Sequence, residues 1–282
     1  MRALILTFIL LSQSVFASND VNISQYFTDK NGCFMLYDMN TGKTVAKYNA
    51  KRCAQRIPAD STFKIALSLM AFDQKIINNG TVFKWDGKSR WLKNWNQDQT
   101  PRTWMQYSVV WVSQLLTPQL GMPKIKNYLQ KFNYGNQDFS GDPGKNNGLT
   151  NAWLNSSLKI SADEQLLFLI NMFTYKLPVS HAAITNTFNN MYIDSNPTTD
   201  LSLYGTQFDT LKNNWQLYGK TGSSGSTGFR DGWFEGIVVK GKQKYVFVTN
   251  FSDTKPASNK ISGGGVAKSI TVLLLNKFVA HE

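Results

Sequence analysis

Two side chains at the start of one apolar segment have the types and the spacing for nucleophilic chemistry. Ser61 and Lys64 stand three positions apart in the stretch DSTFKIALSLMAF, and residues with that spacing on a helix lie on one face. The run from Phe63 to Phe72 is apolar nearly all the way round, which predicts a buried helix. Burial lowers the pKa of a lysine because it disfavours the ammonium form. A neutral amine beside Ser61 could therefore take the proton of the hydroxyl and activate the serine.

Other groups that commonly activate a serine are few. The chain has two histidines, His181 and His281, and the segment LPVSHAAI around His181 contains no nucleophile-elbow pattern. Two cysteines are too few for a zinc site of the multi-cysteine kind. If the chain is a hydrolase, we expect a base other than histidine and no metal.

The S-x-x-K pattern alone is weak, because it should occur about once by chance in a chain of this length. Two further stretches add to it. Lys220-Thr221-Gly222 ends a predicted strand, where a hydroxyl and a glycine would let a substrate lie along the strand edge. Ser108 stands in SVV within a helical region. Taken alone, the first reads equally well as a basic turn and the second as a hydroxyl on a helix face.

Strands at both ends of the chain and helices in the middle would position these residues. The amino end reads as strands up to about residue 49, with a hairpin turning at Asn40-Thr41-Gly42. Helices are predicted over 63–72, 103–116, 123–132 and 162–175, and again from about 265 to 278. Strands are predicted in NWQLYGKTG, DGWFEGIVVKG and KQKYVFVTNF. This order predicts an α+β fold, an antiparallel sheet carrying a helical insertion.

The hairpin also bears on the two cysteines. Within it, Cys33 would face a residue near Asn49 or Ala50 and not Cys53. An exported chain could carry one disulfide, but this register favours two free thiols.

The first residues read as an export signal. MRALILTFILLSQSVFA has a basic Arg2, an apolar run and a small-residue end, which predicts a secretory signal peptide cleaved after Ala17; a short membrane anchor is the alternative. No later segment is long and apolar enough to cross a membrane. The formal net charge of +12 comes from scattered basic residues, which argues against nucleic-acid binding and is compatible with attraction of small anions.

The motifs in their order resemble the serine β-lactamases, specifically class D, the oxacillinases. They are S-T-F-K, S-V-V, Tyr134-Gly135-Asn136 and K-T-G, and the stretch GLTNAWLNSSLKIS resembles the class D segment whose tryptophan lies near the active-site lysine. The resemblance implies an antiparallel sheet flanked by helices plus a mainly helical subdomain, as in penicillin-binding transpeptidases. It implies one catalytic domain over 18–282, with the sheet part at about 18–60 and 205–282 and the helical part at about 61–204.

The resemblance also implies a mechanism. Lys64 would react with carbon dioxide to give a carbamate (N6-carboxylysine), which serves as the general base for Ser61. Val110 would be an apolar wall beside the carbamate, and the indole N–H of Trp153 would donate to it. Read without the family, Val110 and Trp153 are core residues. Ser108 would relay a proton to the departing ring nitrogen, and no cofactor other than CO2 is implied.

Substrate binding follows from the same resemblance. The backbone N–H groups of Ser61 and Ser223 would hold the oxyanion, while Lys220 and Thr221, followed by Gly222, would hold the substrate carboxylate. Many class D enzymes use an arginine after the K-T-G strands for that carboxylate. The stretch SDTKPASNKISGGGVAKS contains none, so Thr221 and Ser262 are expected to replace it, with three further basic residues as alternatives, Arg230, Lys255 and Lys260.

The expected function is hydrolysis of penicillin-type β-lactams in the periplasm, giving resistance, without a membrane anchor or a nucleic-acid partner. A penicillin-binding or sensor protein that does not hydrolyse is the alternative. Asp60, directly before the nucleophile, is unusual where a small residue is common, and its effect on Lys64 is open.

Overall fold

The computed structural model describes residues 21–193 and 211–279. A six-stranded antiparallel sheet in the order β2-β1-β8-β7-β6-β5 forms its centre, and a second, two-stranded sheet pairs β3 with β4. The strands are β1 (Lys30–Asp38), β2 (Lys43–Tyr48), β3 (Ile57–Pro58), β4 (Lys159–Ile160), β5 (Tyr192–Ile193), β6 (Gln216–Ser226), β7 (Phe229–Lys240) and β8 (Gln243–Asp253). The predicted α+β architecture with an antiparallel sheet is confirmed.

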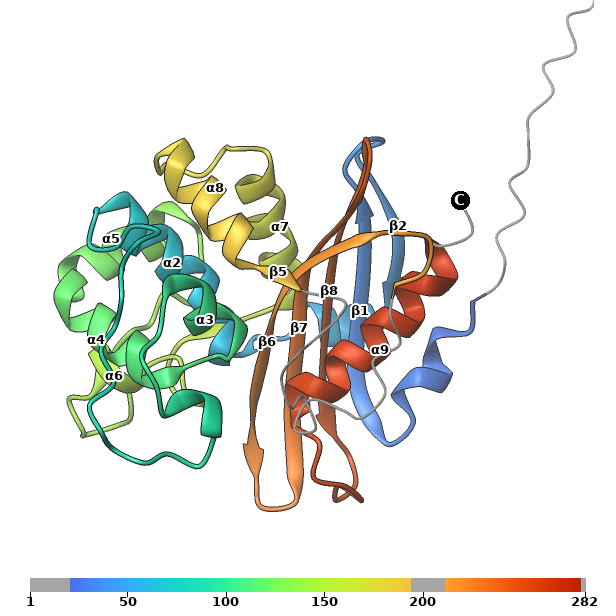
Figure 1. Cartoon of the computed structure of the whole chain (residues 1–282). Coiled ribbons are helices and arrows are strands. Elements are labelled where there is room, and N and C mark those ends of the chain that lie inside the picture. Colours follow the sequence, from blue (N-terminus) through green and yellow to red (C-terminus); the bar gives the residue numbers. More distant parts are fainter. Residues whose placement is uncertain (1–20, 194–210, 280–282) are drawn as a thin grey trace, which may run out of the picture.

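Helices cover the sheet and form a body beside it. Figure 1 shows α2 to α6 gathered beside the sheet, while α9 packs across β6, β7 and β8. The α-helices are α1 (Ala50–Cys53), α2 (Phe63–Asp73), α3 (Pro101–Gln106), α4 (Val110–Leu120), α5 (Met122–Lys131), α6 (Gly148–Asn151), α7 (Ala162–Phe173), α8 (His181–Asn190) and α9 (Gly263–Phe278). Short 3-10 helices are η1 (Ile23–Phe27), η2 (Asp60–Thr62) and η3 (Lys93–Trp95).

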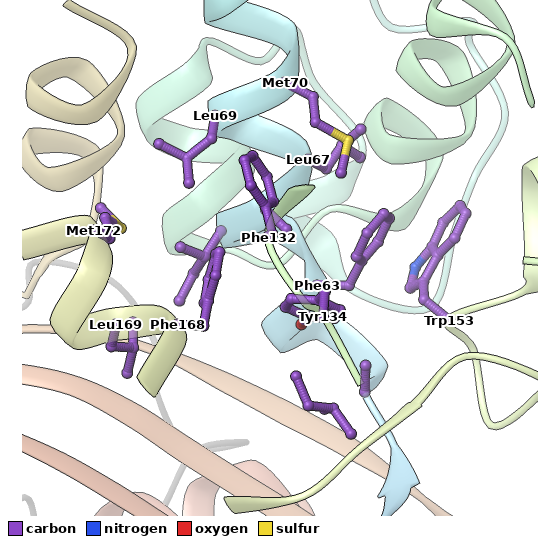
Figure 2. Packing of buried hydrophobic residues seen from close by; sticks show 14 of the residues in the cluster. Phe63, Leu67, Leu69, Met70, Phe132, Tyr134, Trp153, Phe168, Leu169 and Met172 are labelled. Carbon is purple, nitrogen blue, oxygen red and sulfur yellow. The ribbon is translucent and has the colours of Figure 1, made fainter. Parts of the chain in front are cut away.

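The two faces of the sheet belong to two apolar cores. Successive side chains of a strand point to opposite faces, so Trp233 and Ile237 of β7 join the core around α2, whereas Phe234 and Val238 join the core under α9. Figure 2 shows the core around α2, where aromatic rings pack around the helix that follows the predicted nucleophile. This packing fixes α2 against the sheet.

The prediction of one continuous helix over 103–116 is wrong. Thr100 caps α3, which has Pro101 in its first turn and ends at Gln106, and α4 begins only at Val110. Ser108 lies between the two helices with φ of 57°, in the left-handed region. The apolar pattern continues across this break because both helices bury a face in the same core, which is why the pattern hid the break. Ser108 therefore lies in a turn and not on a helix face.

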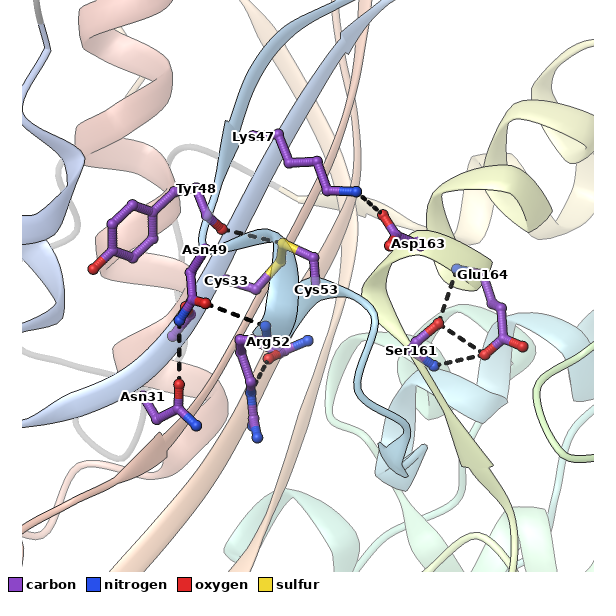
Figure 3. Close-up of a disulfide and its surroundings, with 12 residues drawn as sticks. Asn31, Cys33, Lys47, Tyr48, Asn49, Arg52, Cys53, Ser161, Asp163 and Glu164 are labelled. Carbon is purple, nitrogen blue, oxygen red and sulfur yellow. Dashed lines mark hydrogen bonds and ion pairs between the residues drawn. A yellow bond between two sulfur atoms is a disulfide. The ribbon is translucent and has the colours of Figure 1, made fainter.

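The cysteines form a disulfide, so the expectation of two free thiols is wrong. The hairpin has the register that the sequence predicts, with Phe34 opposite Tyr48. The four-residue helix α1 then turns the chain back, beginning after Asn49 at φ of 57°. This turn brings Cys53 to Cys33 with a Cα–Cα distance of 5.2 Å and a bond between the two sulfurs (Figure 3).

Two expectations concern export. The expected signal peptide, residues 1–17, lies outside the described residues, and its cleavage stays a prediction. Within residues 21–193 and 211–279 there is no helix of the length and apolarity that a membrane crossing requires.

Candidate active site

Ser61 and Lys64 meet at the start of α2, as their spacing predicts. The Lys64 Nζ donates a hydrogen bond to the Ser61 Oγ over 3.0 Å. Lys64 is fully buried, whereas Ser61 is half-buried. Burial lowers the pKa of Lys64 to about 7, and the nearby charge of Asp60 opposes this shift. Much of the lysine is therefore a neutral amine near neutral pH, in contact with the hydroxyl that it would activate.

The segment before Ser61 is fixed at several points. The Ala59 N–H donates to the Leu158 carbonyl over 3.0 Å, and the Trp233 Nε1 donates to the Pro58 carbonyl over 2.9 Å. The Thr62 hydroxyl donates back to the Ala59 carbonyl over 2.6 Å. The serine is thus held between a short sheet, β7 and its own helix.

Trp153 lies in the core beside the first turn of α2. Its ring centroid is 5.6 Å from that of Phe63 and 6.0 Å from that of Phe139 (Figure 2). The side chain is fully buried, yet its Nε1 has no hydrogen-bond partner. A buried indole N–H usually finds an acceptor, and this one has none among the described residues.

Ser108 lies in the turn between α3 and α4, and Val110 begins α4, which packs against α2. Both residues are half-buried. The Trp95 Nε1 donates to the Tyr107 carbonyl over 2.9 Å, which fixes the turn from outside. In the described part of the chain the Ser108 Oγ has no hydrogen-bond partner, so no bond joins it to Ser61 or Lys64 here.

Strand β6 brings the K-T-G residues to the nucleophile. It packs against η2, and a Cβ added at Gly222 would lie 3.2 Å from the Thr62 Cγ2 and 3.3 Å from the Asp60 Cβ. Glycine therefore lets the strand lie close to the serine segment. Lys220 is buried with 3% exposure, and its Nζ donates to the Thr221 carbonyl over 2.8 Å.

The start of α9 packs against the same end of β6. The Ser223 Oγ accepts from the Gly264 N–H over 2.8 Å, and a Cβ at Gly264 would lie 2.9 Å from the Thr221 Cβ. Ser262 caps α9, its Oγ accepting from the Gly265 N–H over 3.1 Å. The structure thus brings Thr221, Ser223 and Ser262 to one place.

Two of the three alternative basic residues are committed elsewhere. The Arg230 guanidinium binds Asp253, with Nε and Oδ2 2.7 Å apart, and also donates to the Ile261 carbonyl. The Lys255 Nζ pairs with Asp29 over 2.8 Å. Lys260 is exposed.

Asp60 is the residue whose influence the sequence could not fix. It has φ of 49° and 2% exposure. Its Oδ2 accepts from the Ser224 Oγ over 2.6 Å, and its Oδ1 accepts from the Asn155 N–H over 3.2 Å. Burial raises the pKa of Asp60 to about 7. Where it is charged, the carboxylate favours the ammonium form of Lys64.

Sequence reasoning missed three polar residues at this site. Ser224 and Asn155 hold Asp60 and carry no local signal. Glu235 lies in β7 at 0% exposure, and the signal for it was a single acid in the apolar run WFEGIVV. Among the described residues, no group of three His, Cys, Asp or Glu side chains is placed to hold a metal ion.

Comparison with known proteins agrees with this geometry. Residues 32–273 match the penicillin-binding protein transpeptidase domain family. The chain is 46% identical over 272 residues to β-lactamase OXA-1 of Escherichia coli, covering 95% of this chain and 92% of that protein.

Solved structures give the same result for the fold. A class D β-lactamase from Bacillus subtilis has a TM-score of 0.76 at 32% identity, covering 92% of this chain and 96% of that one. The carboxyl-terminal domain of the Bacillus licheniformis BlaR penicillin receptor has a TM-score of 0.76 at 28% identity, covering 90% and 94%. The match to OXA-1 over nearly the whole length, with S-T-F-K and K-T-G meeting at one site, places this chain in the class D β-lactamases, within the penicillin-binding transpeptidase fold.

Proposed function

We propose that this class D β-lactamase hydrolyses the β-lactam ring of penicillin-type antibiotics through an ester on Ser61, and so confers β-lactam resistance. The 3.0 Å contact between the Lys64 Nζ and the Ser61 Oγ carries the proposal. The Ser61 oxygen loses its proton to the base, bonds to the lactam carbonyl carbon, and the carbon–nitrogen bond of the ring breaks. Ser108 relays this proton from the base to the departing nitrogen. Water then attacks the ester and frees Ser61.

The base in this proposal is Lys64 carrying a carbamate. A neutral amine and carbon dioxide combine to form a carbon–nitrogen bond, and one proton is released. The carbamate supplies a carboxylate that accepts the proton of Ser61. Three observations support it: Lys64 is fully buried, its pKa is lowered to about 7, and the Trp153 Nε1 is a buried donor without a partner. Val110 gives the site an apolar side.

Substrate binding is proposed along the free edge of β6. Within the described residues, β5 pairs with β6 at Leu217 and Tyr218, and the Gly219 N–H donates to the Met191 carbonyl; beyond Gly219 this edge has no strand partner and β6 lies against η2. The N–H groups of Ser61 and Ser223 would hold the oxyanion. Lys220 and the hydroxyls of Thr221 and Ser262 would hold the substrate carboxylate, with Gly222 between them leaving room.

Export is part of the proposal. Residues 1–17 would be a signal peptide, and the mature enzyme would act in the periplasm without a membrane anchor. The disulfide Cys33–Cys53 supports this, because such bonds persist mainly in oxidising compartments. The mass of the mature protein from the periplasmic fraction would give the cleavage site.

We also propose that residues 18–282 form one catalytic domain, with a sheet part at about 18–60 and 205–282 and a helical part at about 61–204. The core around α2 supports this, since it contains Val246 and Val248 of the sheet together with Leu67 of α2.

The proposed nucleophile is tested by Ser61→Ala. The variant should fold and lose hydrolysis, and intact-protein mass spectrometry with a slow substrate should place the adduct on Ser61 in the parent. Ser226→Ala, at the exposed end of β6, is the control. An adduct elsewhere, or full turnover by Ser61→Ala, would contradict the proposal.

The likeness to the BlaR penicillin receptor supports one other function, a domain that is acylated and does not turn over. Steady-state kinetics separates the two functions. A single stoichiometric burst without turnover, in the presence of bicarbonate, would favour the receptor.

A further inference from the structure

Glu235 is a buried acid that the proposed reaction does not use. It lies on the face of β7 that also carries Trp233 and Ile237, inside the core around α2. Its side chain has 0% exposure, and neither carboxyl oxygen has a hydrogen-bond partner. Burying a carboxyl group without a partner is unfavourable. A neighbouring positive charge would offset that penalty.

Lys220 is such a neighbour. It stands directly opposite Glu235 in the register of β6 and β7, so both side chains lie on one face with Cβ atoms about 4.5–5.5 Å apart. Lys220 is itself buried at 3% exposure, and its Nζ donates to the Thr221 carbonyl and, at 3.4 Å, to the Thr221 Oγ1. These neutral acceptors leave the charge of the ammonium unbalanced.

Before Lys64 carries the proposed carbamate, the other ionisable groups around this pair do not supply the missing charge. Burial lowers the pKa of Lys220 well below its usual value, and the positive charges of Lys64 from α2 and Lys268 from α9 lower it further. Glu235 is the group that raises it. Burial raises the pKa of Tyr134, and the charge of Glu235 raises it further, so Tyr134 supplies no positive charge to the acid. Asp60 acts on Lys64, and it is not among the groups that shift the pKa of Lys220.

We propose that Glu235 is a positioning residue that keeps Lys220 charged at the edge of the active site, where the lysine attracts the anionic β-lactam. The inference rests on the role given to Lys220 in the proposed function. The sheet supplies the arrangement. Lys220 and Glu235 form one cross-strand pair, and Thr221, which follows Lys220 in β6, is one of the residues proposed to hold the substrate carboxylate.

Glu235→Gln tests this inference, because glutamine keeps the shape of the side chain and removes its charge. The pH profile of kcat/KM for benzylpenicillin should keep its form, while the alkaline limb, where Lys220 loses its proton, moves down by about one pH unit. At pH values above the limb, KM should rise by a larger factor than kcat falls. Glu235→Asp should keep the limb near its original pH. Ile237→Val is the matched control, since it alters packing on the same face of β7 without changing a charge.

Two failures can be told apart. If Lys220→Met hydrolyses penicillin as well as the parent does, the proposed role of Lys220 is wrong. If Lys220→Met is impaired but Glu235→Gln folds and leaves the alkaline limb unmoved, the inference about Glu235 alone is overturned.

Thermal unfolding supplies a second measurement if Glu235→Gln is too unstable for kinetics. Lys220→Met should lower Tm, because it leaves the buried carboxylate without its opposite charge. Adding Glu235→Gln to Lys220→Met should then restore part of that loss. If Glu235→Gln lowers Tm as much in the Lys220→Met background as in the parent, the two residues are not coupled and the inference is refuted.

Discussion

Loading of Lys64 with carbon dioxide should follow the ionisation of its buried amine. Only the neutral amine attacks CO2, and the pKa of Lys64 is about 7. At pH 7 about half of the lysine is neutral, against about 0.04% for a lysine of pKa near 10.4. Burial therefore raises the reactive fraction by about a thousandfold or more. At pH 5.5 the neutral fraction falls to about 3%, so the loading rate should drop roughly fifteenfold from its value at pH 7.

A loading experiment measures this directly. Enzyme is degassed at mildly acidic pH until hydrolysis is lost, then returned to buffers between pH 5.5 and 8 that hold the same concentration of dissolved CO2. Holding CO2 constant leaves the amine as the titrating reactant. Activity should recover over a time course slower than turnover, and ¹³C-labelled bicarbonate should give a carbamate signal in NMR.

Variants assign the signal. Ser61→Ala should keep it because Lys64 remains, whereas Lys64→Ala should lose it and hold penicillin as a long-lived ester on Ser61. Val110→Asp should weaken it by placing a second negative charge beside the carbamate. The reasoning is refuted if active, bicarbonate-supplied enzyme gives no carbamate signal and Lys64→Ala still deacylates normally. A loading rate that is flat from pH 5.5 to 8 would refute the lowered pKa of Lys64.

Three further predictions follow from particular contacts. Thr221→Ala and Ser262→Ala should each raise KM roughly tenfold or more, since a hydrogen bond to a charged group contributes about 1.5–3 kcal/mol. Ser262→Asp can still cap α9 but should raise KM further, because its charge repels the substrate carboxylate. An unchanged KM in the Ser262 variants would exclude the role of Ser262. Asp60→Asn should become more stable than the parent as pH rises from about 4 to 7. The folded pKa of Asp60 is raised from 3.8 to about 7, so the parent loses up to about 4 kcal/mol of its free energy of unfolding over that range. Urea unfolding at both pH values measures the difference between the two proteins, and a difference that does not change with pH would contradict the burial of this carboxyl. Cys53→Ser should lower the free energy of unfolding by about 3 kcal/mol, because the disulfide closes a loop with a sequence separation of 20. Reducing the disulfide of the parent should cause the same loss.

Much of the fold could be predicted because its elements have strong periodicity. The three long strands and the helices at α2, α5, α7 and α9 follow apolar patterns of period two or of helical spacing. The break at Ser108 could not be predicted, since α3 and α4 bury side chains in one core and the apolar pattern crosses the turn. The disulfide was missed for a similar reason. A four-residue helix after Asn49 reverses the chain, and a single helical turn has no periodicity to detect.

The candidate site was predictable where spacing along one element sets the geometry. Ser61 in η2 and Lys64 in α2 stand one turn apart where the two helices follow each other without a break, so their contact follows from their spacing. The partners of Asp60 come from a loop at Asn155 and from β6 at Ser224, and no local pattern links these three positions. Tertiary packing alone brings them together.

The buried charges explain why such a site can exist in an apolar core. Asp60, Lys64, Lys220 and Glu235 are all buried, and burial pushes both acids and both lysines towards their neutral forms. A change at one group therefore shifts its neighbours, because the low dielectric of the core leaves their charges weakly screened. Adding a carbamate to Lys64 replaces a positive or neutral group by an anion, which should favour the charged form of Lys220 and the protonated form of Asp60. Loading the base would then also favour the form of Lys220 that binds the substrate carboxylate, so that the two halves of the site are coupled through charge.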